Sequence, residues 1–562
     1  LPAICYNPGM LGRRTVLVAF ALCVASVLAA DPRLIYRSDP VYSQVRRLAL
    51  QARVAPPSRT SPITAAELTL TLDRISTADL TESQIAEYQR LRDLLAVPNA
   101  EVDRAVTPDA TEAQGFEPVG TVGIEAAAEL YLHTAGDADE WMLWYPDRKP
   151  LLSIPMRARP FGSLAIEFDL DWRKNYPLYP GSGLSTVNPD PISNIPGDMR
   201  ESDVQFPYHA LVSVGGERWS VQLGRSRVAL GFGEGGSLFL SDHVDYHEFL
   251  LASVFGHLFS YRALYLDLES WSSSPPEERM FFAHRIEMRP FDWLSLAAND
   301  GFIVAEKPIE LRYYNPLMIM HSWFVPNFGN SILNFEFAVR PLPGLELYGH
   351  LGIDQLSSAV ERERGYADGE PQALGFLAGA QYVWNLSNIQ LTSGSEWVFL
   401  DPWMYLGRTE LGSFTYRRRV QAENVLPSGA KVLVEKSLGY PEGPDFYELA
   451  AYTAAEFPGG HAAAVELSFG ARGENAVGRF LPPEDEADAL RVTPSGPAPE
   501  FIFHTRLSGD AVLGSFQIAT LPVNLHAGGV LDFIRVINND HQAGAILADL
   551  QFSPYILVDI GY

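Results

Sequence analysis

The C-terminal segment Leu550–Tyr562 is the feature that most constrains how this chain can fold. Every second residue in it is apolar or aromatic, and the residues between them are mostly polar or small. Because side chains on a β-strand alternate between two faces, this pattern predicts a strand with one apolar and one polar face. An edge strand of a soluble β-sandwich would show the same alternation, so the rest of the chain has to decide between the two.

The N-terminus predicts export from the cytoplasm. Met10 is a plausible true start, because two arginines follow it, an apolar segment covers residues 15–27, and small residues suited to cleavage end at Ala30. We therefore expect residues 1–30 to be upstream residues and a signal peptide, and the mature chain to begin near residue 31.

The cysteines support the same interpretation. Cys5 and Cys23 are the only two, and both precede the predicted cleavage site. The mature protein would then contain no disulfide, which excludes a cysteine-stapled scaffold. A lipoprotein anchor at Cys23 is disfavoured because the residue before it, Leu22, is not small.

A membrane protein of this sequence would have to be a barrel. No run of about 20 apolar residues follows the N-terminus, so no helical span is predicted, and only a helix or a closed barrel pairs every backbone polar group in lipid. An amphipathic last strand that ends on the aromatic Tyr562 is similar to the assembly signal of outer-membrane β-barrels. We therefore expect outer-membrane lipid around the barrel, and recognition of this last strand by the barrel-assembly machinery.

The sequence pattern of residues 41–95 predicts helices. Apolar residues recur at helical spacing in 41–54, 61–75 and 81–95. Ser61-Pro62 predicts a cap followed by proline at the first helical position, and Thr81 with Gln84 has the spacing of a capping box. Three short helices with short connections predict a small bundle, and we place it at 31–112, on the periplasmic side of the barrel or plugging it.

From residue 113 to 562 the pattern changes to strands. Hairpin candidates with short turns alternate with long polar segments such as 175–200, 357–371 and 473–500. Short turns on one side and long loops on the other are typical of bacterial barrels. Several soluble sandwiches are the alternative, but no Pro/Ser-rich linker divides this region. The predicted fold is an all-β transmembrane antiparallel barrel of about 16–18 strands with a small N-terminal helical bundle.

Three stretches resemble the Wzi family of outer-membrane capsule-assembly proteins. The first is the helical region with the run Thr60–Leu68, and the second is the Gly-rich stretch Leu230–Ser241. The third is Asn315-Pro316 followed by 327–354, where Leu347-Tyr348-Gly349 precedes Asp354. The resemblance implies a large barrel, a helical bundle that closes its periplasmic end, and a lectin-like role towards surface polysaccharide.

Sugar binding usually combines aromatic platforms with polar groups. Four aromatic residues lie in or near predicted loops and are candidates for stacking on sugar rings, although each could equally be a packing or lipid-interface residue: Trp271, Trp323, Tyr366 and Trp403.

The charge pattern is acidic overall with one basic run. The formal net charge of −26 argues against nucleic acid as a partner. Arg417, Arg418 and Arg419 form a local cationic run that could face a lumen as in a pore or contact lipid headgroups at the rim.

Other motifs favour neither cofactor nor catalysis. The stretch 231–236 fits G-x-G-x-x-G, but a strand-like segment, 237–241, follows it where a nucleotide fold needs a helix, so we interpret the glycines as tight strand packing or a barrel turn. The donor-rich stretch 242–248 lacks the H-E-x-x-H order and a third distant ligand, so no metal is predicted. No nucleophile elbow occurs, and no cofactor or catalytic residue is predicted.

The predicted function is therefore non-enzymatic: an outer-membrane β-barrel that binds or assembles a capsule-like surface polysaccharide. A passive channel (porin) for small solutes is the alternative, and an outer-membrane hydrolase with a Ser/His pair on neighbouring strands is less favoured.

Overall fold

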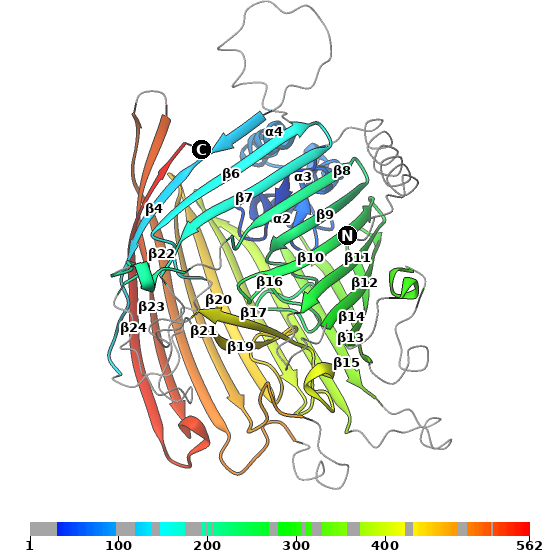
Figure 1. Ribbon diagram of the computed structural model, residues 1–562. Helices are drawn as coiled ribbons and strands as arrows, with labels where there is room; N and C mark the ends of the chain where they lie inside the picture. The colour runs from blue at the N-terminus through cyan, green and yellow to red at the C-terminus, as the bar shows by residue number, and fades with distance from the viewer. Residues whose placement is uncertain are drawn as a thin grey trace, which may run out of the picture.

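The computed structural model shows a large antiparallel barrel with a small helical unit at one end (Figure 1). It describes residues 31–96, 119–135, 147–174, 193–197, 199–203, 207–268, 279–305, 310–315, 318, 329–356, 371–421, 431–480, 492–518 and 521–561. The predicted signal peptide and the predicted boundary at 112/113 lie outside these ranges. Among the described residues, no helix has both the length and the apolar character needed to span a bilayer.

The helical unit contains the three predicted helices, α2 (Pro40–Gln51), α3 (Ala65–Leu72) and α4 (Glu82–Ala96). Two-stranded pairing of β1 (Leu34–Ile35) with β2 (Ile63–Thr64) ties the start of the unit to α3. Their apolar faces pack together in one buried cluster, whose fully buried members are Val45, Leu48, Ala49, Ala65, Leu68, Leu72 and Leu91.

Two of the predicted helix starts can be checked. The Thr81 backbone N–H donates to Gln84 Oε1 at 2.8 Å, which confirms the capping interaction. The predicted Ser61 cap is wrong: α3 begins at Ala65, and Thr64 Oγ1 accepts from the Glu67 N–H at 3.3 Å. Ser61 instead pairs its backbone with Ala229, with both N···O distances at 3.0 Å.

The barrel wall is closed and antiparallel. Within the described ranges, β3, β4 and β5 are consecutive pieces of one strand, so the wall has 18 strands. Their bounds are β3 Val119–Val122, β4 Ile124–Glu129, β5 Leu132–His133, β6 Leu152–Phe161, β7 Leu164–Trp172, β8 Ala210–Gly216, β9 Trp219–Ser226, β10 His247–Phe255, β11 Phe259–Leu268, β12 Arg279–Phe291, β13 Leu294–Ala305, β14 Gly329–Leu342, β15 Leu345–Gln355, β16 Ala373–Leu386, β17 Ile389–Leu400, β20 Phe446–Phe457, β21 His461–Arg472, β22 Glu500–Ile518, β23 Leu521–Ile537 and β24 Ile546–Ile560.

The last strand closes the ring. β24 pairs with β23 on one side and with β4 and β5 on the other, so that Ile556 lies opposite Ala128 and Phe552 opposite Leu132. The predicted alternation is confirmed for the described part of this strand: Phe552 is 42% exposed, whereas its neighbour Gln551 is 2% exposed. Tyr562 lies outside the described residues.

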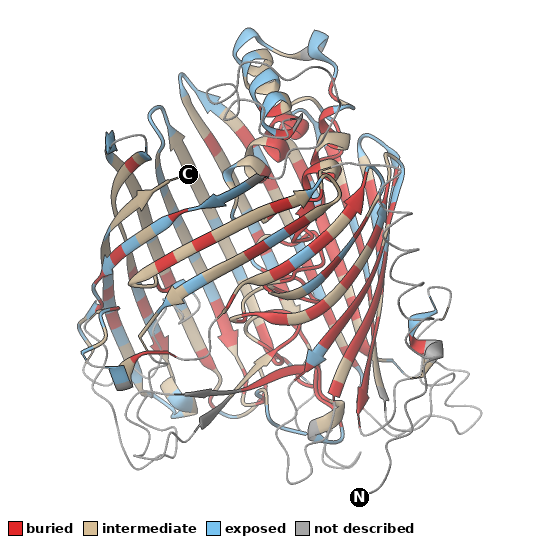
Figure 2. Ribbon diagram, turned by 45° about the horizontal axis from the view of Figure 1, so that its top comes forward, coloured by how far each residue is buried: buried red, intermediate tan, exposed pale blue. Residues whose placement is uncertain are grey.

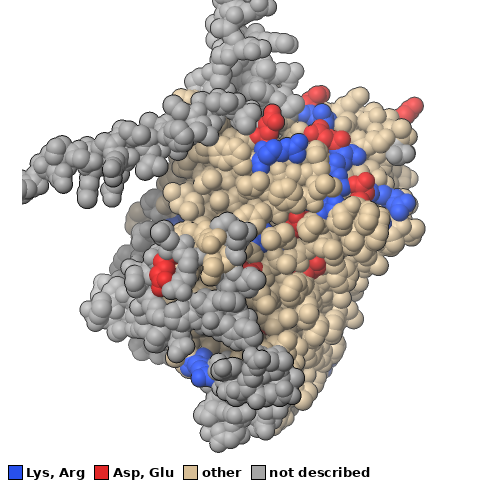
Figure 3. All heavy atoms as spheres, turned by 90° about the vertical axis from the view of Figure 1, so that its right-hand side faces the viewer, with Lys and Arg blue, Asp and Glu red and all other residues tan. Residues whose placement is uncertain are grey.

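The outer surface of the wall is apolar, as lipid requires. Large apolar side chains are exposed at alternating positions around the ring, among them Leu170, Leu223, Ile286, Met288, Phe335, Phe337, Leu449, Leu467, Phe503, Phe533, Phe552 and Ile556. On the face shown in Figure 3, charged side chains gather mainly towards the upper edge, and most of the surface below it carries other residues.

The two ends of the barrel differ. The connections β6–β7, β8–β9, β10–β11, β12–β13, β14–β15, β16–β17, β20–β21 and β22–β23 are short turns, and all but one of the connections at the opposite end are long. The helical unit lies at the short-turn end (Figure 1), where the Gly344 N–H donates to the Leu50 carbonyl at 2.8 Å and Arg74 pairs with Asp292. In bacterial barrels the short turns face the periplasm.

If one face of β24 contacts lipid, a charged residue on that face should lower the free energy of unfolding, and more so near the middle of the bilayer than at its edge. Replacing Phe552 by Arg near the middle of the strand should lower the free energy of unfolding by about 2–4 kcal/mol, because the guanidinium would lie in hydrocarbon. Urea titration of the protein refolded into lipid vesicles measures this. Ile546→Arg, at the strand end, is the control and should cost only about 0–1 kcal/mol; equal costs at both positions would contradict the assignment.

Candidate functional site

Two long connections fold into the barrel and form an interior filling. They are 227–246, between β9 and β10, and the described residues 401–421 and 431–445, between β17 and β20, which include the pair of strands β18 (Thr415–Gln421) and β19 (Lys431–Ser437). Their apolar residues share one buried cluster with inward-facing wall residues. The members from the connections are Val228, Leu230, Phe232, Leu238, Phe239, Leu240, Val244, Met404, Tyr405, Phe414, Tyr416, Leu438 and Tyr440.

The two connections are joined to each other. The Tyr405 hydroxyl donates to the Leu238 carbonyl at 3.0 Å, and the Ser241 N–H donates to the Leu438 carbonyl at 2.9 Å. Figure 2 shows that buried residues concentrate on the strands around β10 to β15. The filling therefore packs as a single body against that side of the wall.

The glycine-rich stretch belongs to this filling, which corrects the sequence interpretation. We call residues 231–236 the glycine hairpin; it is neither a turn of the wall nor a site of tight strand packing. The segment 237–241 forms no strand and makes only one isolated bridge, between Leu230 and Leu240. The apolar run Leu238–Leu240 that suggested a strand is instead buried inside the barrel.

Glu396 of β17 anchors the glycine hairpin. Its carboxylate accepts hydrogen bonds from the backbone N–H groups of Glu234 (2.8 Å) and Gly235 (3.1 Å) and from the Tyr348 hydroxyl (2.8 Å). A Cβ atom at Gly235 would lie 3.0 Å from a Glu396 oxygen, so glycine allows this close approach. Three donors around one carboxylate fix the hairpin to the wall.

Arg59 holds the other side of the glycine hairpin. This residue lies in the helical unit between α2 and α3, and its guanidinium pairs with Glu234 at 2.6 Å, donates to the Phe232 carbonyl, and donates to Gln381 at 3.1 Å. It also lies over the Tyr348 ring at 4.7 Å. Arg59 therefore links the helical unit, the glycine hairpin and the wall.

The charge state of Glu234 follows from these neighbours. Burial alone would raise the pKa of Glu234, but the guanidinium groups of Arg59 and Arg37 outweigh burial and lower the pKa below its ordinary value. Glu234 is therefore ionised at neutral pH, and its attraction to the two arginines stabilises the filled interior.

Further ion pairs tie the helical unit to strands around the mouth. Arg46 pairs with Glu346 of β15, which also pairs with Arg340 at 3.0 Å. Arg47 reaches Glu456 of β20 at 2.9 Å. Further pairs are Asp31 with Arg159 of β6 and Glu67 with Arg262 of β11. The unit thus contacts the wall at widely separated strands.

The wall itself carries a buried charged cluster beneath the glycine hairpin. Arg285 of β12 pairs with Glu336 of β14 at 2.8 Å and lies 5.1 Å from the Phe232 ring centre. Asn299 donates to the same Glu336 carboxylate at 2.7 Å. Removing one partner of such a buried pair leaves an uncompensated charge, so these residues fix the inner surface on which the filling packs.

The donor-rich stretch after the hairpin is used for internal contacts. Asp242 lies 3.9 Å from Arg37, and Asp245 pairs with Arg418 at 2.8 Å. Burial, with a smaller contribution from Lys436, lowers the pKa of His243 to about 4, so its imidazole is neutral at pH 7. Within the described ranges, no group of three or more His, Cys, Asp or Glu side chains is placed to hold a metal ion.

The predicted sugar-stacking residues are only partly placed. Trp271, Trp323 and Tyr366 lie outside the described residues. Trp403 is 3% exposed and packs with Ala373 and Leu406 in the interior. Since protein atoms cover its ring, no sugar stacks on Trp403 in this conformation, and its role in sugar binding stays a prediction.

The three arginines lie on the β18–β19 hairpin rather than on a wall strand. Arg417 pairs with Glu435 across the hairpin at 2.7 Å. Arg418 is buried, where it lies 3.1 Å from the Tyr246 ring centre. Arg419 lies opposite Leu433 in the hairpin register. Arg417 and Arg418 therefore have specific partners within the filling, and a role of the run in selectivity stays a prediction.

Comparisons with known proteins identify solved structures that share this fold. No family model and no curated protein matches the chain. Among solved structures, the chain is similar to Wzi, described as an outer membrane protein involved in group 1 capsule assembly in Escherichia coli and as a carbohydrate binding β-barrel. The TM-score is 0.53 at 13% identity, covering 93% of this chain and 98% of that one. This chain has a Wzi-like outer-membrane β-barrel fold.

Other solved structures align with lower scores. OprD of Pseudomonas aeruginosa aligns at a TM-score of 0.37 and 10% identity, over 79% of this chain and 95% of that one. The OccK5 (OpdH) structure from the same organism aligns at 0.36 and 10% identity, over 79% and 98%.

The Glu396 anchor predicts a variant with a loosened interior. Glu396→Ala removes the acceptor of two partly buried backbone N–H groups and of the buried Tyr348 hydroxyl. Leaving the buried hydroxyl without a partner costs about 1–3 kcal/mol, and the two N–H groups add less because water can reach them. We expect this variant to show conductance in planar bilayers above that of the wild-type protein. Glu466→Ala in β21 removes a carboxylate away from the anchor and is the control; equal currents in both variants would refute the anchoring role.

The lowered pKa of Glu234 predicts a pH-dependent stability difference. The folded-state pKa lies below the unfolded value of about 4.3, so the stabilisation is complete above that value and is lost as the pH falls through the folded-state pKa. The difference in urea midpoint between wild type and Glu234→Gln should therefore be largest near neutral pH and shrink in acid. Glu82→Gln, at the exposed start of α4, should give a small difference; a Glu234→Gln difference that grows in acid would contradict the assignment.

Proposed function

We propose that this protein is a non-enzymatic outer-membrane barrel that binds polysaccharide at the cell surface. The observation that carries the proposal is the interior filling, held to the wall by Glu396 and to the helical unit by Arg59. On the side of β10 to β15 the lumen is occupied by packed apolar side chains, and such a filling favours a binding protein over a passive channel, because a channel needs a continuous water-filled path.

The similarity to Wzi supplies the ligand class. Its fold extends over nearly the whole of this chain, and its description names carbohydrate binding. We extend that ligand class to this protein, with the short-turn end and the helical unit in the periplasm and the long connections outside the cell. Signal-peptide export, as predicted from residues 1–30, is part of the same proposal.

The binding surface would lie at the end of the long connections. In chain order, Trp271 falls between β11 and β12, Trp323 between β13 and β14, and Tyr366 between β15 and β16, and all three of these connections leave the wall at that end. Aromatic rings there could stack on sugar rings, with polar neighbours supplying hydrogen bonds.

Substitution of the two tryptophans tests the proposal. Trp271→Ala and Trp323→Ala should each reduce retention of surface polysaccharide on whole cells, at an unchanged protein level, because an apolar platform for the sugar is lost. The amount of polysaccharide in the cell-bound and released fractions measures this.

Trp293→Ala is the matched control. Trp293 is 47% exposed, but it lies at the β12–β13 short turn, at the opposite end of the barrel. Unchanged retention in both test variants would remove these residues from the proposal. Steady wild-type conductance for small solutes in planar bilayers, without polysaccharide binding, would establish the channel function instead.

A further inference from the structure

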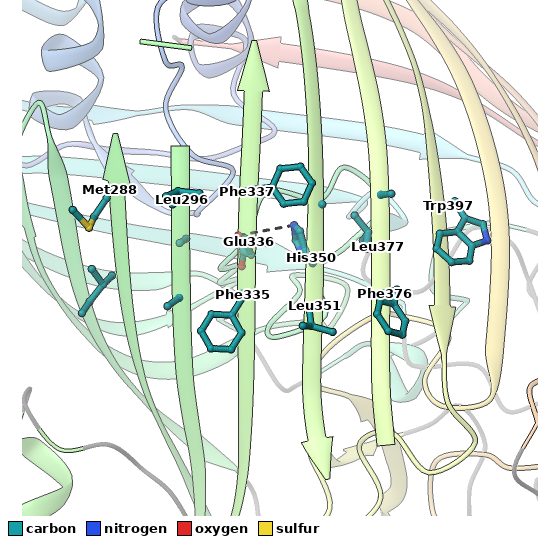
Figure 4. A pocket seen from close by; sticks show the side chains of 15 residues that line it. Met288, Leu296, Phe335, Glu336, Phe337, His350, Leu351, Phe376, Leu377 and Trp397 are labelled. Carbon is teal, nitrogen blue, oxygen red and sulfur yellow. Dashed lines mark ion pairs between the residues drawn. The ribbon is translucent and has the colours of Figure 1, made fainter. Parts of the chain in front are cut away.

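An apolar groove runs across the outer face of β12 to β17. Its volume is about 690 Å³, and its bulky lining side chains, such as Phe335, Phe337 and Trp397, point away from the lumen (Figure 4). Bulky residues form its sides, among them Met288, Leu296, Phe335, Phe337, Phe376 and Trp397.

Small residues on three of the strands deepen the groove. Ala298 of β13, Gly349 of β15 and Ala378 of β16 line it between the bulky side chains. A Cβ atom at Gly349 would lie 2.7 Å from the Phe337 ring, so glycine lets this ring lie close against the wall. The groove is thus a consequence of where small and aromatic residues alternate on the outward positions.

The groove offers no hydrogen-bonding group to a ligand. The two polar residues among its lining, Glu336 and His350, are 3% and 5% exposed, and their side chains extend to the inner side of the wall, where they lie 3.9 Å apart. A sugar or another polar molecule would lose its hydrogen bonds with water on entering. The chemistry of the lining therefore selects hydrocarbon.

The place of the groove in the wall indicates the source of that hydrocarbon. It is continuous with the exposed apolar belt of the barrel, and its residues lie around the middle of β14 and β15. Charged side chains gather at the edge of the barrel on the short-turn side (Figure 3), the level at which headgroups would lie. The groove therefore lies at the depth of the lipid acyl chains.

We propose that this groove is a binding site for a phospholipid, which lays an acyl chain between Phe337, Phe376 and Trp397 over the small residues Gly349 and Ala378. The site retains its lipid more firmly than the convex remainder of the belt, because the chain contacts protein on its sides as well as beneath it. This inference does not depend on the polysaccharide-binding function.

Filling the groove tests the proposal. Three proteins are compared: wild type, Ala378→Phe and the control Ala451→Phe. The control adds the same ring to the exposed outer face of β20. Each protein is purified in mild detergent, and the detergent buffer is replaced repeatedly to remove loosely bound lipid. Native mass spectrometry then measures bound phospholipid and oligomeric state. We expect wild type and Ala451→Phe to retain a phospholipid and Ala378→Phe to lose it.

Each other outcome overturns the proposal. Equal retention in all three proteins would mean that the groove holds no lipid of its own. If wild type is a dimer that Ala378→Phe converts to a monomer without a change in lipid, the occupant is a second copy of the chain. Heat-modifiable migration on a gel confirms that each variant is folded, and Ala298→Phe on β13 gives the same test if Ala378→Phe fails to fold.

Discussion

Pairing of the last strand with the first is the interaction on which the rest of this structure depends. Once β24 lies against β4 and β5, no wall strand has an unpaired edge, which lipid would not tolerate. The closed ring separates two surfaces with different requirements. Its outer face carries exposed apolar side chains, and its inner face carries the charged and polar groups that organise the interior.

Charged groups on the inner surface hold protein segments in place. Glu396 binds backbone N–H groups of the glycine hairpin, and Arg59 binds Glu234 on the other side of it. The buried Arg285–Glu336 pair is costly to desolvate and is balanced by Asn299 and further partners. These contacts join the helical unit and the two long connections to one side of the wall, and the proposed binding role rests on this arrangement.

The wall could be predicted from the sequence because its signal is local. Strand alternation in 550–560, helical spacing in 41–95 and the distribution of short turns each depend on neighbouring residues, and the structure agrees with them. The interior could not be predicted in the same way. Arg46 and Glu346 are separated by 300 residues and Glu234 and Glu396 by 162, and no periodicity links them. The sequence interpretation of the glycine hairpin is wrong because a short apolar run such as Leu238–Leu240 fits a wall strand and a buried connection equally well.

The order in which the chain is enclosed follows from the same topology. The helical unit comes from the N-terminal part of the chain, and the filling comes from two connections in the middle of the sequence. The wall itself is closed by the last strand, β24. The helical unit and the two connections are too bulky to pass between paired strands. They must therefore lie inside the barrel before β24 pairs with β4 and β5, or must enter afterwards through an open end of the barrel. In this protein the C-terminal strand is therefore the element that fixes which segments lie inside the wall once it has paired with β4 and β5.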